Sequence, residues 1–188
     1  MAFRTDTCVA MKVHMSLKPY TIIEPTVPRT PLIVDSPHSG RLYPADFDYT
    51  CPLPLLRQTE DSFVDELVVG ATQAGASILM AEFPRSYIDV NRAEDDIDPA
   101  ILANPWPYSL APSDRTLMGL GLVRRLCKSG VPVYREPLVV SEVEKRIHCF
   151  YRPYHAALEK LIADRIAVFG VCYLVNAHSM PNQSGESG

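Results

Sequence analysis

Two short apolar runs, one near each end of the chain, lead directly to a histidine. Residues 32–36 lead through Pro37 to His38, and residues 173–177 lead to His178; a serine follows each histidine. Runs of this length and composition predict buried β-strands. In an open α/β sheet, side chains just past the carboxyl ends of strands face the ligand crevice. The two runs therefore predict a sheet that places two imidazoles at one edge.

Strand and helix patterns alternate along the rest of the chain. Apolar spacing and turn residues predict helices over 59–74, 114–129 and 141–168, the last kinked or split by Pro153. Shorter runs predict strands over 77–83, 87–90 and 171–176, and the proline-rich segment 93–113 predicts a surface loop. This alternation favours an α/β fold, a three-layer α/β/α sandwich with a mixed sheet.

The chain divides into three parts of unequal size. Residues 1–30 form an expected loosely ordered lead-in, residues 31–181 a single domain, and residues 182–188 a short polar tail that we expect to be flexible. A chain of 188 residues is long enough to bury one substantial core.

Composition excludes several classes of partner. The net charge is −4 and no basic stripe occurs, which argues against a nucleic-acid surface. No apolar run approaches the roughly 20 residues that span a bilayer, and the first residues lack a secretory apolar segment. Five scattered cysteines without a CxxC pair favour neither a disulfide framework nor a structural zinc site. We therefore expect a cytoplasmic protein.

The two histidines suggest a metal site if a carboxylate lies near them. A catalytic zinc ion usually takes three protein ligands and leaves one position for water. Glu60 and Asp61, at the start of a predicted helix, are the candidates for the third ligand. Each residue also has a simpler interpretation: acidic groups favour helix starts, and a loop histidine often bonds a backbone carbonyl. A zinc site would favour amide hydrolysis.

A second cluster combines cations and an amide at a predicted strand end. Arg85 and Arg92 flank Asp89 and Asn91. The planar fork of arginine matches a carboxylate, and an asparagine amide adds a further donor. Taken alone, the cluster indicates an anion site or an ordinary surface group of ion pairs.

Together these segments resemble the N-formylglutamate amidohydrolase (N-formylglutamate deformylase) family. The matching stretches occur in family order at residues 35–40, 60–67, 83–92, 151–155 and 169–181. Each stretch alone is a weak signal, but five in order are specific, and they span most of the chain.

The resemblance implies a fold like that of the zinc carboxypeptidases and a single zinc ion. By motif position the ligands would be His38, His178 and Asp61, with Glu60 as the alternative to Asp61. A substrate carboxylate would be held by Asn91 and Arg92, helped by Arg85. The implied reaction is hydrolysis of N-formyl-L-glutamate to formate and L-glutamate, a step of histidine degradation, with a small acidic substrate as the partner.

Two departures from the family pattern leave other functions open. Asn176 stands where the family usually has an aspartate that could orient His178. Family members also continue well past His178, and that part supplies further strands and a glutamate general base. The alternatives are therefore a truncated, inactive remnant that binds an acidic small molecule, or an amidohydrolase for another acyl amino acid. A missing part of the sheet would leave apolar surface, so we expect self-association.

Overall fold

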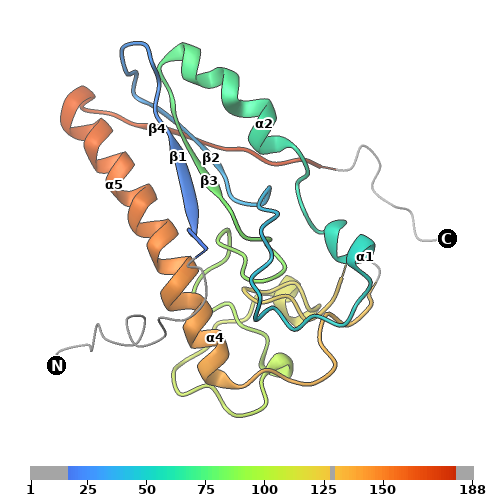
Figure 1. Ribbon diagram of the computed structural model, residues 1–188. Coiled ribbons are helices and arrows are strands. Elements are labelled where there is room, and N and C mark those ends of the chain that lie inside the picture. Colours follow the sequence, from blue (N-terminus) through green and yellow to red (C-terminus); the bar gives the residue numbers. More distant parts are fainter. Residues whose placement is uncertain (1–16, 128–129, 181–188) are drawn as a thin grey trace.

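The computed structural model describes residues 17–127 and 130–180 and is built on a four-stranded sheet (Figure 1). In the order β1-β3-β2-β4, the strands are β1 (Tyr20–Ile23), β3 (Ser77–Ala81), β2 (Leu32–Ser36) and β4 (Tyr173–Asn176). β2 pairs in parallel with β3 and β4, whereas β1 pairs antiparallel with β3. The expected α/β class with a mixed sheet is confirmed.

Helices of very different length accompany the sheet. The α-helices are α1 (Leu53–Arg57), α2 (Val64–Val68), α3 (Asp114–Leu117), α4 (Val140–Arg146) and α5 (Arg152–Phe169). Two 3-10 helices, η1 (Val69–Ala74) and η2 (Pro99–Ile101), and a π-helical turn, η3 (Ile147–Tyr151), complete the list for the described residues.

The alternation of side chains along β2 and β3 builds two cores. Ile33 and Leu79 belong to the larger core, which includes buried residues of α5. Val34 and Ile78 belong to a smaller one, packed against α2 and η1. Because neighbouring residues of each strand enter different cores, α5 and α2 cover opposite faces of the sheet (Figure 1).

Two predicted helices are shorter than the apolar spacing suggested. The helix expected over 114–129 ends at Leu117, because Gly119 adopts a left-handed φ of 87° and the chain turns back on itself. The helix expected from residue 59 begins at Val64, because Phe63 has a left-handed φ of 65°. A left-handed residue cannot lie inside a right-handed helix.

The other differences lie in loops and at the amino-terminal side. Residues 87–90, expected as a strand, form turns. Residues 20–23 of the expected lead-in form β1, which pairs with β3 residue by residue. The long helix expected here is interrupted by η3 between α4 and α5: the N–H of Arg152 donates to the carbonyl of Ile147, five residues back, and Pro153, which has no N–H, lies in the first turn of α5. The tail 182–188 and residues 1–16 lie outside the described residues.

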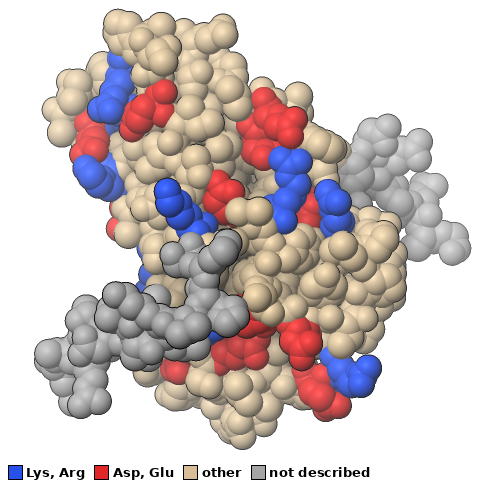
Figure 2. Space-filling model, in the orientation of Figure 1, with Lys and Arg blue, Asp and Glu red and all other residues tan. Residues whose placement is uncertain are grey.

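The surface carries charges of both signs. On the face in Figure 2, lysine and arginine side chains lie beside aspartate and glutamate side chains instead of forming a patch of one sign. No described helix is both long and apolar enough to cross a lipid bilayer.

Strand β4 is unusually exposed for a strand in parallel pairing. Among the described strands β2 is its only partner, and its opposite edge is free. Leu174 and Val175, which point to opposite faces, are 43% and 49% exposed. Strands of parallel sheets are normally covered on both faces, and a free apolar edge is a template for pairing with another chain. We therefore expect β4 to mediate self-association.

Replacing Leu174 by lysine should reduce that self-association, because edge charges block strand pairing. Light scattering over a range of concentrations should show a smaller mean mass for Leu174→Lys than for the parent chain. Met118→Lys, at an exposed position outside the sheet, is the control. A parent chain that stays monomeric at every concentration would contradict this expectation.

Candidate metal centre

The parallel pairing of β2 and β4 brings the two sequence-distant histidines together. Asp35 of β2 lies opposite Asn176 of β4, so the segments that follow leave the sheet at the same edge. His38 and His178 lie on these segments, and their Nδ1 atoms are 3.1 Å apart. The sheet register therefore accounts for a contact between residues at opposite ends of the chain.

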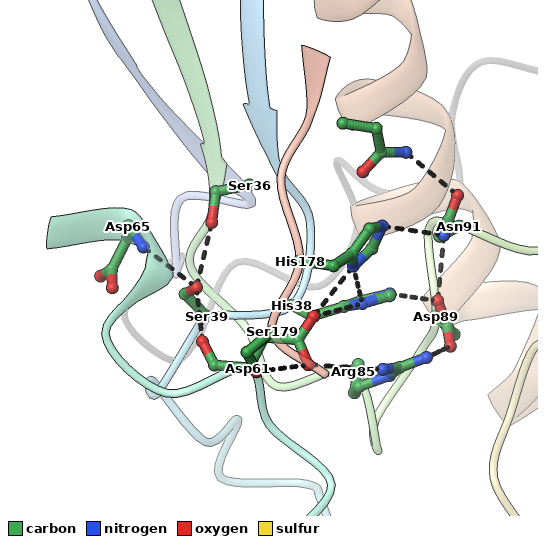
Figure 3. Close-up of polar contacts among 11 residues, drawn as sticks. Ser36, His38, Ser39, Asp61, Asp65, Arg85, Asp89, Asn91, His178 and Ser179 are labelled. Carbon is green, nitrogen blue, oxygen red and sulfur yellow. Dashed lines mark hydrogen bonds and ion pairs between the residues drawn. The ribbon is translucent and has the colours of Figure 1, made fainter. Parts of the chain in front are cut away.

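Asp61 reaches the same point through its backbone. Its N–H donates to the carbonyl of His38 (3.0 Å), and its carbonyl accepts from the hydroxyl of Ser39 (2.8 Å). With the backbone held in this way, Oδ2 of Asp61 lies 3.3 Å from Nδ1 of His38 and 2.9 Å from Nδ1 of His178 (Figure 3). We call these three residues the His–Asp–His group.

The donor atoms of the His–Asp–His group suit a divalent cation. All three lie within 4.8 Å of one another. Two ligands of a tetrahedral zinc ion at 2.0–2.1 Å are separated by about 3.3 Å, close to the separations found here. His38 and Asp61 are buried, whereas the side chain of His178 is 28% exposed, so the group can be reached from one side. Catalytic zinc sites typically have this pattern of protein ligands, such as two imidazoles and one carboxylate, with one coordination position open to water.

The surroundings keep Asp61 ionised. Burial alone would raise its pKa, but hydrogen bonds with His38 and His178 outweigh burial and lower the pKa to about 2. The carboxylate is therefore charged at neutral pH, as a metal ligand must be.

Glu60, the alternative ligand, points elsewhere. Its carboxylate accepts a hydrogen bond from the hydroxyl of Tyr43 and lies 3.6 Å from Nε of Arg57. The structure thus brings Asp61, and not Glu60, to the two histidines.

Asp89 is a functional candidate that sequence patterns alone do not single out. Its Oδ1 lies 2.7 Å from Nε2 of His38, and Nη2 of Arg85 donates to its Oδ2 at 2.8 Å. Burial would raise the pKa of Asp89, but the contacts with His38 and Arg85 hold it well below its usual range. An ionised Asp89 fixes the ring proton of His38 on Nε2, which leaves the Nδ1 lone pair free for a metal.

Two of the three predicted substrate-binding residues, Arg85 and Asn91, contact the His–Asp–His group, and all three already have polar partners. Arg85 contacts Asp89 as described, and its Nη1 lies 3.9 Å from Oδ1 of Asp61. The side-chain amide of Asn91 lies 3.2 Å from Nε2 of His178. Arg92 is next in the chain, and its Nη1 lies 3.6 Å from Oδ2 of Asp96.

Asn176, the departure noted above, reaches His178 only indirectly. Its side-chain Nδ2 donates to Oδ1 of Asn91 at 3.2 Å, and Asn91 in turn contacts His178. A histidine that binds metal through Nδ1 carries its proton on Nε2, so Asn91 would have to present its amide oxygen to that proton. In the structure Asn91 presents Nδ2 to that ring, so the side-chain amides of Asn91 and Asn176 would both have to turn over to support His178 as a metal ligand.

Asp89→Asn tests the orienting role of the buried carboxylate. Loss of a charge-assisted bond should lower the free energy of unfolding of the metal-free protein at neutral pH by about 1–3 kcal/mol, measured by urea denaturation. Zinc affinity should fall about 10–100-fold in a chelator competition. The exposed Asp48→Asn variant is the control.

The stability of Asp89→Asn should also depend on pH differently from that of the parent chain. The pKa of Asp89 in the folded state lies below its reference value of 3.8, so its stabilising effect is full above about pH 4 and is lost as the pH falls further. Unfolding of Asp89→Asn should therefore depend less on pH below about 4 than unfolding of the parent chain. Equal acid sensitivity of the two proteins would count against the ionised carboxylate.

Comparison with known proteins gives a consistent result. The model of the N-formylglutamate amidohydrolase family matches residues 30–188. An N-formylglutamate deformylase of Pseudomonas aeruginosa is 33% identical over 156 residues, which is 81% of this chain and 53% of the relative. One of Pseudomonas putida is 30% identical over 155 residues, 81% of this chain and 52% of the relative.

A solved structure extends the likeness to the fold. The crystal structure of N-formylglutamate amidohydrolase from Ralstonia eutropha JMP134 superposes with a TM-score of 0.85 at 45% identity, covering 88% of this chain and 59% of that one. The chain spans about half the length of the curated relatives it matches. On the family match and the shared fold, the chain belongs to the N-formylglutamate amidohydrolase family.

Proposed function

We propose that this chain carries the zinc site of an enzyme that hydrolyses N-formyl-L-glutamate to formate and L-glutamate, in histidine degradation. The observation that carries the proposal is the convergence of His38, His178 and Asp61 on one point. The substrate comes from the names of the relatives, which are N-formylglutamate deformylases. A zinc-carboxypeptidase-like sandwich is part of the same proposal.

The residues around the site have distinct tasks in this proposal. A zinc ion bound there would polarise the formyl carbonyl and make a bound water acidic near neutral pH. Asp61 contributes the negative charge of the ligand set, and Asp89 holds the proton of His38 on Nε2. The general base is proposed to lie in the part of the full-length relatives that this chain does not cover.

A small acidic substrate is the proposed partner. Arg85 and Asn91 lie beside the His–Asp–His group, and Arg92 follows Asn91 in the chain; these three residues would bind a substrate carboxylate through guanidinium and amide donors. A cytoplasmic location is also proposed. Cys51, Cys127 and Cys172 of the described part of the chain form no disulfide, which is in keeping with a reducing compartment.

A second candidate function is binding without turnover. It is favoured by one observation: the chain covers only about half of the curated relatives, so it can hold metal and ligand while lacking other parts of the enzyme. An acyl amino acid other than N-formylglutamate is the remaining alternative for the substrate. Assays with several N-acyl amino acids separate that alternative from the leading one.

Removal of either histidine should abolish metal binding. The parent chain should hold about one zinc ion after dialysis, whereas His38→Ala and His178→Ala should hold none, measured by mass spectrometry of the metal. Loss of a group that only orients a metal ligand costs up to about 100-fold in activity. Loss of the ligand itself should therefore lower formate release by more than this factor. His148→Ala is the matched control, because that imidazole bonds the carbonyl of Glu144, away from the His–Asp–His group.

The outcomes separate the candidates. Equal zinc content in the parent and in both histidine variants would contradict the metal site. Stoichiometric zinc that depends on the histidines, without formate release from any N-acyl amino acid, would favour binding without turnover.

A further inference from the structure

One buried cation near the candidate metal centre forms no ion pair with the residues that the structure describes. In the part of the chain that the structure describes, three arginines are buried: Arg124, Arg146 and Arg165. Arg146 pairs with Glu142, and Arg165 with Glu24. Arg124 is 8% exposed, and no described carboxylate forms an ion pair with it; like the Nε atoms of Arg146 and Arg165, its Nε is buried without a hydrogen-bond partner.

Arg124 lies in the electrostatic field of the candidate site. The segment that carries it is tied to the site, because the carbonyl of Leu122 accepts the backbone N–H of Asp89 at 2.7 Å. The charges that act on Arg124 are those of Arg85, Asp89, Arg92 and Asp61, all residues of the site or its border. Burial and the nearby Arg85 lower the pKa of Arg124 to about 10, so it remains protonated at neutral pH.

An unpaired buried guanidinium is costly for a folded protein unless an anion compensates it. The neighbouring cations are already compensated: Arg85 lies beside Asp89 and Asp61, and Arg92 beside Asp96. Arg124 is therefore the cation here that most needs an anion from a ligand. Its planar fork suits a carboxylate.

We propose that Arg124 is a specificity-determining residue that binds a second carboxylate of the ligand, so that the site selects N-acyl amino acids with an acidic side chain. The proposal rests on the proposed function, in which Arg85, Asn91 and Arg92 hold the first carboxylate. With Arg124 in this role, the site distinguishes N-formylglutamate from N-formylglutamine, which carries a side-chain amide in place of the side-chain carboxylate.

Calorimetry on the full chain tests this selectivity without requiring turnover. Binding of N-formyl-L-glutamate and N-formyl-L-glutamine is measured in the presence of a chelator. The parent chain should bind the glutamate derivative at least about tenfold more tightly, the effect of one charge-assisted bond. Arg124→Met should bind both about equally, and Arg124→Lys should recover part of the preference, since it keeps the charge but not the fork.

Arg125→Met is the matched control. Arg125 is the next residue, and its Nε donates to Asp98 at 2.7 Å, so its loss should leave the preference for the glutamate derivative unchanged. Without ligand, Arg124→Met should unfold at the same or a higher urea concentration than the parent, because an uncompensated charge is removed. That measurement also shows that the variant is folded.

Either of two results would overturn the proposal: a folded Arg124→Met protein that keeps the tenfold preference, or a parent chain without measurable preference. Zinc content and formate release, measured separately, keep the two proposals apart. A chain that binds zinc and releases formate but does not prefer the acidic side chain contradicts only the role of Arg124. A chain with the preference but without zinc or formate release contradicts only the hydrolytic function.

Discussion

The parallel pairing of β2 with β4 is the constraint on which the candidate site depends. It aligns Asp35 with Asn176, and the few residues that follow each strand carry His38 and His178 to one point. A shift of one residue in this register would turn every β4 side chain to the opposite face. The sheet, and not either loop alone, therefore brings together the two histidines of the candidate metal centre.

Asp89 links the candidate metal centre to the residues proposed to bind an anion. One of its oxygens faces Nε2 of His38 and accepts the N–H of Asn91, while the other accepts from Arg85. The backbone of this segment is also held from the helical side, where the ring of His155 bonds the carbonyl of Val90 at 2.9 Å. A change in the position of this loop would thus alter both the ligand histidine and the residues proposed to bind substrate.

The sequence predicted those parts of the site that local patterns encode. The apolar runs before His38 and His178 predicted strands, and parallel strand ends predicted their meeting. Local spacing could not choose between Glu60 and Asp61, because the choice depends on a backbone bond to His38 made across 23 residues. The proposed roles of Asp89 and Arg124 could not be predicted for the same reason. Asp89 is singled out by its contacts with His38 and Arg85, and Arg124 by burial without an ion pair among the described residues, and both depend on the folded chain.

The errors in the fold arose where glycine or a left-handed residue overrode apolar spacing. Gly119 ended a helix that periodicity extended by three turns, and Phe63 delayed another. Strand β1 was missed because its four residues lie among prolines, and only pairing with β3 gives them extended structure. None of these differences separates the His–Asp–His group, because β2 and β4 position the two histidines and the bonds to His38 and Ser39 position Asp61.

Anomalous diffraction from crystals grown with zinc shows most directly whether these three side chains hold one metal ion. We expect one strong peak about 2.0–2.2 Å from Nδ1 of His38, Nδ1 of His178 and an oxygen of Asp61, with Nε2 of His38 still facing Asp89. Zinc bound through Nε2 of either ring, or a peak away from these three residues, would contradict this expectation.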